Sequence, residues 1–233
     1  MPIAIDERIF ADADALAVAL AREVANDLRA GIATRGGAIV ALSGGTTPRR
    51  FLECLSREAL DWTRTTVTLA DERWVPPQDP RSNERLLRET LLRGAAAAAR
   101  FVPLYADAVT PEQAYAAIAA NVAKLPLPFD AVVLGMGTDG HCASLFPGGD
   151  HLDAALQPHS SIRVMTMRAA GADEPRMTLT LAALVDTHAL YLQIEGTTKR
   201  DVFVRIQGGD VTPAPIRTVL QHSPVTPVSF WCP

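Results

Sequence analysis

An acid and a base stand two positions apart, Asp139 and His141, shortly after the unbroken apolar run at 131–134. Three glycines lie between and around them, so the chain can turn sharply here. Histidine titrates near neutral pH and can take a proton from water without a large pKa shift. We therefore predict that His141 acts as a general base at the end of a buried strand and that Asp139 supports it.

A histidine that is only hydrogen-bonded within a loop is the commoner case. That interpretation is assigned to the four other histidines of the chain: His151, His159, His188 and His222. His141 differs from them because an acid and a glycine framework accompany it. Cys142 is assigned to packing, because adjacent side chains on a strand-like turn point apart. The chain has no GxSxG elbow for a serine nucleophile and no Cys/His cluster, so no metal is predicted.

A second motif, Ser43-Gly44-Gly45-Thr46-Thr47-Pro48, lies between the apolar run at 38–42 and a helical pattern that begins near Phe51. A strand, a glycine-rich turn and a helix together place backbone N–H groups and the helix dipole around an anion. The motif matches neither GxGxxG nor GxxxxGK[ST], so neither NAD nor ATP is implied. The motif therefore favours anion binding, with a plain strand-to-helix turn as the alternative.

Two further polar segments follow predicted strands. Asp71-Glu72-Arg73 comes after the strand expected at 65–70, and Gly196-Thr197-Thr198-Lys199 comes after the strand expected at 189–194. Taken alone, the first segment is equally typical of a solvated loop with an internal ion pair. Ligands of open α/β sheets bind at the carboxyl ends of the strands, where all four segments would meet. Hydroxyls, amides, cations and one histidine there suit acid–base chemistry on a phosphorylated, polyhydroxylated small molecule.

Strands alternate with helices through most of the chain. This order predicts a mostly parallel, doubly wound α/β sheet with helices on both faces, in one domain spanning residues 1–233. The first helix is expected from 12 to 30, capped by Asp12 or Asp14 and ended by Gly31. Thr110 is expected to cap a later helix. Residues 162–167 alternate like a half-exposed strand, and 175–181 are taken as the approach to another helix.

The composition is that of an ordinary globular protein and argues against several classes of partner and location. The chain has 233 residues, 48% of them hydrophobic, and a net charge of -4, which argues against a nucleic-acid partner. Its three cysteines form neither a CxxC pair nor a metal-binding pattern, which favours a reducing cytoplasm. No signal peptide is recognised, and no apolar run reaches the roughly 18 residues of a membrane span. The oligomeric state stays open, and a monomer is compatible with the sequence.

Taken together, the motifs resemble those of the 6-phosphogluconolactonase family, in order and over nearly the whole chain. The most specific is the string from Gly135 to Gly148, GMGTDGHCASLFPG. The other matching segments are SGGTTP at 43–48, DERW at 71–74, SN at 82–83, RMTLT at 176–180 and GTTK at 196–199. The sequence departs from the family pattern at Cys142, where Thr is common, at Thr46, where Ser is common, and in a tail without the usual acidic residue.

The resemblance implies a fold shared with glucosamine-6-phosphate deaminases. It also implies cofactor-free hydrolysis of 6-phospho-D-glucono-1,5-lactone, a step of the oxidative pentose phosphate pathway. His141 would activate the attacking water, and Asp139 would orient or electrostatically support it. The phosphate would be held by Ser43, Gly44, Gly45 and Thr46 with charge from Lys199. Arg73 and Arg176 would bind phosphate or other substrate oxygens, in roles that the sequence does not separate.

The sequence leaves two alternative functions open. One is a sugar-phosphate isomerase or deaminase on the same fold; Arg73 argues against it, because that branch typically carries an aromatic residue at this position. The other is a non-catalytic sugar-phosphate sensor that kept the phosphate loop. The presence of both Asp139 and His141 argues against a sensor.

Overall fold

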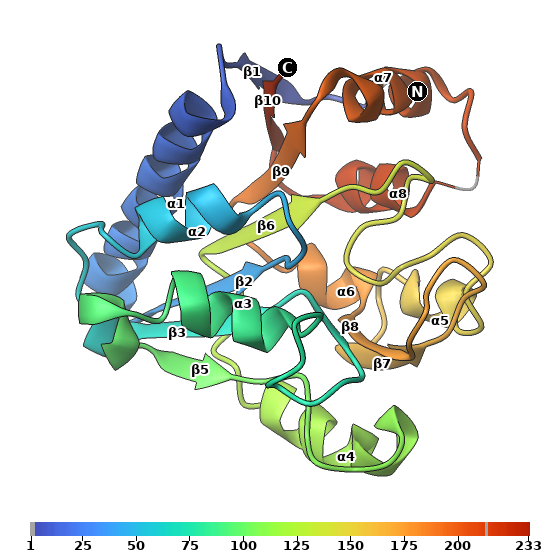
Figure 1. The fold of residues 1–233 in the computed structure, drawn as a ribbon, viewed down its shortest axis with the longest axis horizontal. Helices are drawn as coiled ribbons and strands as arrows, with labels where there is room; N and C mark the ends of the chain where they lie inside the picture. The colour runs from blue at the N-terminus through green and yellow to red at the C-terminus, as the bar shows by residue number, and fades with distance from the viewer. Residues whose placement is uncertain (1–2, 213) are drawn as a thin grey trace.

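A computed structural model describes residues 3–212 and 214–233 of the chain. Its centre is a parallel sheet in the order β1-β10-β9-β6-β2-β3-β5 (Figure 1). Parallel neighbours place the carboxyl ends of these strands along one edge. The strands are β1 (Asp6–Ile9), β2 (Ala38–Leu42), β3 (Thr65–Leu69), β5 (Arg100–Val102), β6 (Ala131–Gly135), β9 (Leu190–Glu195) and β10 (Val228–Cys232).

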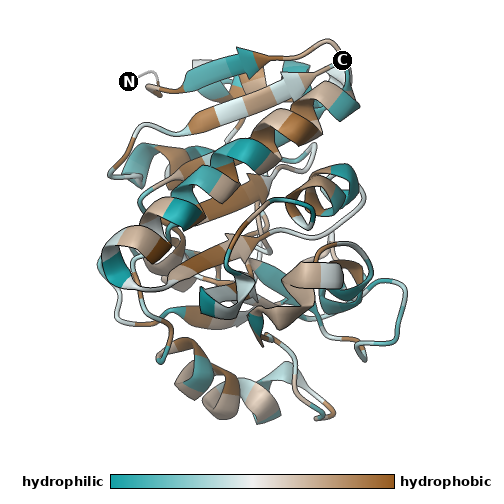
Figure 2. Ribbon diagram, turned by 90° about the vertical axis from the view of Figure 1, so that its left-hand side faces the viewer, coloured by the Kyte–Doolittle hydropathy of each residue, from teal (hydrophilic) through white to brown (hydrophobic). Residues whose placement is uncertain are grey.

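Helices flank this sheet, which confirms the predicted fold class. The longest, α1, packs against β2, β6 and β10 and lies beside α2. In Figure 2 it crosses the sheet with hydrophilic and hydrophobic residues alternating along it. None of the described helices is long and apolar enough to cross a membrane. The helices are α1 (Ala13–Arg35), α2 (Arg49–Leu55), α3 (Asn83–Thr90), α4 (Pro111–Val122), α5 (Leu152–Ala155), α6 (Leu181–Leu184), α7 (Thr197–Gly208) and α8 (Pro215–His222).

The central strands are buried along nearly their whole length because both of their faces are covered. All five residues of β2 are buried, as are the first four of β6 and the first five of β9. Covered strands of parallel sheets read as continuous hydrophobic runs rather than alternating ones. The strands predicted at 38–42 and around 131–134 are thereby confirmed, and the latter delivers the chain to Asp139 and His141.

A second, antiparallel sheet stands beside the first, and the sequence did not predict it. It has the order β4-β8-β7, formed by β4 (Asp71–Arg73), β8 (Arg176–Leu179) and β7 (Val164–Met167). Ala70 links the two sheets, because its N–H donates to the carbonyl of Leu42 and its carbonyl accepts from the N–H of Leu179. Residues 71–73 were expected as a polar segment that follows a strand, either at a ligand site or in a solvated loop, and 175–181 as the approach to a helix. Neither segment was recognised as a strand, because each is only three or four residues long and lacks a continuous apolar run.

One expectation at a helix end was also wrong, and a second was met in position but not in its hydrogen bond. Helix α1 passes through Gly31 and ends at Arg35, followed by Gly36 in the left-handed region at φ 80°. Gly31 is needed for packing instead, since a Cβ there would lie 2.1 Å from Oδ1 of the buried Asp130. Asp12 does cap α1, accepting the N–H of Ala15 at 2.8 Å. Thr110 occupies the N-cap position of α4 without a side-chain capping hydrogen bond.

One carboxyl group far from the strand ends gives folding a dependence on pH. Tyr191 donates its hydroxyl hydrogen to Oδ2 of Asp27 at 2.6 Å. Burial raises the pKa of Asp27 to about 6, from 3.8. The folded state favours the protonated form of Asp27, so this carboxyl group contributes its full stabilisation only below its pKa in the unfolded chain. The stabilisation is lost as the pH rises through about 6, the pKa of Asp27 in the folded protein.

The variant Asp27→Asn keeps an acceptor for Tyr191 but cannot ionise. The parent protein should therefore lose stability between pH 4.5 and 7.5, and the variant should not. We expect the difference in free energy of unfolding, variant minus parent, to increase by about 1 kcal/mol over this range, a figure reduced for solvent screening. Urea unfolding at both pH values measures this difference. The exposed Asp153→Asn is the matched control and should track the parent. The same shift in both variants would contradict the assignment to Asp27.

Candidate active site

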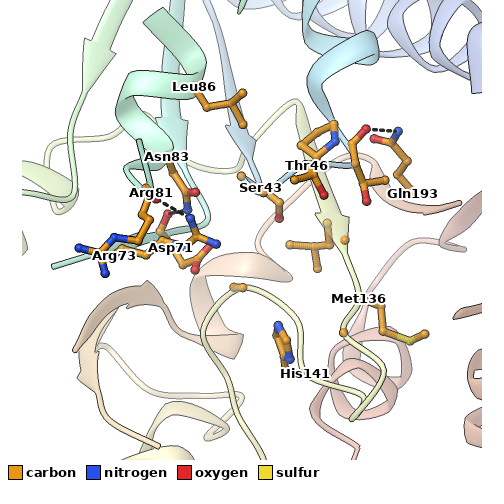
Figure 3. A pocket seen from close by; sticks show the side chains of 18 of the residues that line it. Ser43, Thr46, Asp71, Arg73, Arg81, Asn83, Leu86, Met136, His141 and Gln193 are labelled. Carbon is orange, nitrogen blue, oxygen red and sulfur yellow. Dashed lines mark hydrogen bonds between the residues drawn. The ribbon is translucent and has the colours of Figure 1, made fainter. Parts of the chain in front are cut away.

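The carboxyl ends of β2, β3, β6 and β9 surround a cavity of about 900 Å³. Figure 3 shows its walls, with the loop after β2 facing the loop that carries His141 and the second sheet to one side. Eight of the nine residues predicted for the site line this cavity, and the ninth, Asp139, stands behind His141. The eight are Ser43, Gly44, Gly45, Thr46, Arg73, His141, Arg176 and Lys199.

Asp139 contacts the histidine on two atoms. Its Oδ1 lies 2.6 Å from Nδ1 of His141 and accepts the backbone N–H of the same residue at 3.2 Å. A carboxylate at this distance requires the hydrogen on Nδ1, which leaves Nε2 unprotonated in the neutral ring. The arrangement therefore provides a base whose tautomer is set by its acidic neighbour.

The loop backbone gives this pair the space it needs. A Cβ on Gly137 would lie 2.2 Å from Cε1 of His141 and 2.6 Å from Oδ1 of Asp139. Gly137 also donates its N–H to the carbonyl of His141 at 3.0 Å. The glycine at this position is thus required by the close approach of the acid–base pair.

The neighbouring Cys142 has no comparable role. Its side chain is 1% exposed, and burial raises the pKa of its thiol well above the usual range. Nucleophilic attack by a cysteine requires the thiolate, which this environment disfavours. The sequence-based assignment of Cys142 to packing agrees with this burial.

A cationic wall lies beside His141. The ring of His141 packs on Phe146, with ring centroids 4.5 Å apart. The guanidinium of Arg176 lies over the same Phe146 ring, 5.6 Å from its centroid. Arg176 is 9% exposed, and burial lowers the pKa of its guanidinium. Arg73 pairs with Arg176 across β4 and β8, and its guanidinium donates to the carbonyl of Arg81. Two arginines thus face the cavity from the second sheet.

The anion-binding loop is separate from that wall. It follows β2, and Gly45 adopts φ 93°, a left-handed value that favours glycine. Lys199, in the first turn of α7, donates from Nζ to Oγ1 of Thr47 at 3.4 Å. Among the described residues, Lys199 has no carboxylate within ion-pair distance, so its charge is available to a ligand beside the loop. The structure therefore brings Lys199 to the loop at 43–48, as the sequence predicted.

Three cavity residues were missed by the sequence reasoning. Gln193, on β9, donates from Nε2 to the carbonyl of Thr47 and so ties the anion-binding loop to the sheet. Arg81 lies at the mouth and pairs with Asp79 and Glu174. Asn83 lies at the start of α3; the sequence placed it in a family-matching segment but assigned it no role in the site. A polar residue in the middle of the buried run 190–194 was the one signal that pointed to Gln193.

The buried Glu72 fixes the start of α3. Its carboxylate accepts the N–H groups of Asn83 and Glu84, each at 2.7 Å, and that of Arg73 at 2.8 Å. Burial raises the pKa of Glu72 to about 7, against these hydrogen bonds, which lower it. A carboxylate at a helix N-terminus pairs with N–H groups that the helix itself leaves free. Glu72 therefore supports the wall of the cavity without facing it.

Fold and site together define an α/β protein with a cavity at the carboxyl ends of its parallel strands, lined by cationic side chains and by one member of an acid–base pair. Comparison with known proteins makes the class specific. The chain belongs to the family of glucosamine-6-phosphate isomerases and 6-phosphogluconolactonase, whose model matches residues 11–228.

Individual relatives agree with this assignment. The chain is 50% identical over 226 residues to a 6-phosphogluconolactonase of Rhizobium meliloti (strain 1021), covering 97% of both chains. A crystal structure of a 6-phosphogluconolactonase from Shewanella baltica superimposes with a TM-score of 0.93 at 36% identity, over 98% of both chains. A monomeric glucosamine-6-phosphate deaminase matches with a TM-score of 0.77 at 18% identity, over 98% of this chain and 97% of that one, and thus shares the fold.

Proposed function

We propose that the protein is a 6-phosphogluconolactonase, which hydrolyses 6-phospho-D-glucono-1,5-lactone to 6-phospho-D-gluconate in the oxidative pentose phosphate pathway. The observation that carries the proposal is His141, which lines the cavity while Asp139 binds its Nδ1. The relatives at up to 50% identity bear the same name, which supports this activity.

In the proposed reaction, Nε2 of His141 takes a proton from water as the water oxygen bonds to the lactone carbonyl carbon. The imidazolium then returns the proton to the ring oxygen as the bond between the ring oxygen and the carbonyl carbon breaks. A lactone is already an activated ester, so a positioned base and donors for the oxyanion suffice without a covalent intermediate. Asp139 would hold the ring and stabilise its charged form.

The two cationic regions suggest a division of roles. Ser43, Gly44, Gly45 and Thr46 would bind the phosphate together with Lys199, which the structure places beside this loop. Arg176 lies over the ring that touches His141, so we propose that it binds oxygens close to the reacting carbonyl. Arg73 would support the same side of the substrate.

Hydrolysis of freshly generated 6-phosphogluconolactone, measured above the spontaneous background, tests the proposal. The unphosphorylated lactone should be a much poorer substrate, because remote phosphate binding contributes to orienting the ring. Ammonia release from glucosamine 6-phosphate would favour a deaminase instead, although Arg73 argues against it. Ligand binding without turnover would favour a sensor.

Lys199→Ala is expected to raise KM for the phosphorylated lactone about tenfold or more, with a smaller change in kcat. The reason is the loss of a charge-assisted contact to the phosphate, worth about 1.5–3 kcal/mol. Initial rates over a range of substrate concentrations measure both constants. The exposed Lys124→Ala is the matched control. An unchanged KM in Lys199→Ala would remove this residue from the phosphate site.

The remaining features of the proposal concern the whole molecule. We propose a cytoplasmic enzyme without a nucleic-acid partner, in keeping with the net charge of -4 and with cysteines that are all unpaired in the described residues. One domain over residues 1–233 is supported by the hydrogen bonds through Ala70 that join the two sheets.

A further inference from the structure

Buried polar side chains connect the loop that carries His141 with the anion-binding loop. Ser144 donates its hydroxyl hydrogen to Oδ2 of Asp71 at 2.5 Å. Asn83 donates from Nδ2 to the backbone carbonyl of Asp71 at 2.9 Å. The end of the same side chain lies against Gly44 of the anion-binding loop. These three side chains are at most 7% exposed. Figure 3 shows Asp71 and Asn83 close together in one wall of the cavity, to the left of Ser43 and His141.

The contact between Asn83 and Gly44 leaves no free space. A Cβ on Gly44 would lie 1.9 Å from Oδ1 and 2.1 Å from Cγ of Asn83. The same Oδ1 is buried and has no hydrogen-bond partner among the described residues. Leaving a buried acceptor unpaired destabilises the folded state. Asn83 thus occupies the space beside Gly44 with a buried acceptor that no described side chain or backbone group satisfies, which points to a role in the site.

Asn83 is also held from behind. Its backbone N–H donates to Glu72 at 2.7 Å, and Glu72 in turn accepts the N–H groups of Arg73 and Glu84. The side chain is therefore carried by a fixed helix start rather than by a mobile loop. Any movement of the anion-binding loop toward α3 would meet this side chain.

The other end of the connection fixes the loop of His141. The backbone N–H of Ser144 donates to Oγ1 of Thr178 on β8 at 3.2 Å, in addition to the hydroxyl contact with Asp71. The preceding residue, Ala143, has φ 48°, a left-handed value that is strained for a non-glycine residue. The contacts of Ser144 with the second sheet hold this strained turn two residues after His141.

We propose that Asn83 is a positioning residue that sets the spacing between the anion-binding loop and His141. Through it, phosphate binding brings the lactone carbonyl to the distance at which His141 can activate water. This inference rests on the proposed lactonase function. Its physical basis is that an error of about 1 Å in the placement of a reactant can cost about 10²-fold in rate. The spacing matters only for a substrate that is held at both ends, by its phosphate in the anion-binding loop and by its carbonyl group at His141. The phosphate is therefore the substrate group that makes turnover sensitive to this spacing.

The test compares Asn83→Ala with the exposed control Asn121→Ala on two substrates, the 6-phosphorylated lactone and the unphosphorylated lactone. For the parent protein, the ratio of the two kcat values measures how much the phosphate accelerates turnover. We expect this ratio to fall about tenfold or more in Asn83→Ala and to stay unchanged in Asn121→Ala. Thermal unfolding of each variant checks that it is folded. If Asn83→Ala does not fold, Asn83→Ser provides the same shortening with a polar group.

The outcomes are distinct. Equal losses of kcat with both substrates, and hence an unchanged ratio, would show that Asn83 has only a structural role and would overturn the inference. An effect on KM alone, with the kcat ratio retained, would overturn it as well. A parent protein that hydrolyses neither lactone above background would instead overturn the proposed function, and the inference with it.

Discussion

His141→Ala is expected to lower kcat for 6-phosphogluconolactone by about 10²–10⁴-fold, the usual contribution of a positioned general base. The reason is that the described residues place no second imidazole on the cavity. The phosphate-binding groups lie on other elements, so the variant should still bind the product, 6-phosphogluconate.

Two measurements check this expectation. Turnover is followed with freshly generated lactone after subtraction of the spontaneous rate, and product binding is followed by calorimetry. The exposed His159→Ala serves as the matched control and should behave as the parent protein. If His141→Ala kept full activity, the general base would have to be another group.

Asp139→Ala is expected to lower kcat about 10²-fold while KM changes little, because the ring of His141 loses the acceptor that fixes its tautomer and orientation. Asp139→Asn should retain more activity than Asp139→Ala. Its amide oxygen can still accept the Nδ1 hydrogen, although the negative charge that stabilises the imidazolium is gone.

The decisive measurement is a double-mutant cycle with His141→Ala. If Asp139 acts through His141, the double variant should be no slower than His141→Ala alone, because residues that act as a unit are strongly non-additive. Additive losses would instead mean that Asp139 contributes independently, for example by contacting substrate itself.

The inner strands of the central sheet could be predicted because they are long apolar runs, as the buried run 38–42 illustrates, whereas the exposed edge strand β1 has no such run. The second sheet could not, because Asp71-Glu72-Arg73 forms a strand only through pairing with β8, a partner more than 100 positions away. Gly31 shows the same limit. In sequence it is a typical helix end, and only the approach of Asp130 explains a glycine in the middle of α1.

The candidate site was predicted where motifs are local, as for His141 with Asp139 or the loop at 43–48. Residues whose role depends on contacts between distant parts of the chain were not predicted. Asn83 reads as a helix start, yet its side chain meets Gly44 from the neighbouring strand end. Gln193 is one polar residue within a strand, and its partner Thr47 lies 146 positions earlier.

The burial of Cys142 has a consequence for how the protein withstands chemical attack. Sulfur next to a histidine is usually a target for peroxide and for electrophilic reagents, which react with the thiolate. Here the sulfur is covered and its pKa is raised, so the residue beside the base is inert. Cys54 is the more accessible thiol and lies on α2, away from His141. Oxidants should therefore modify the surface of α2 before they reach the residues that perform catalysis.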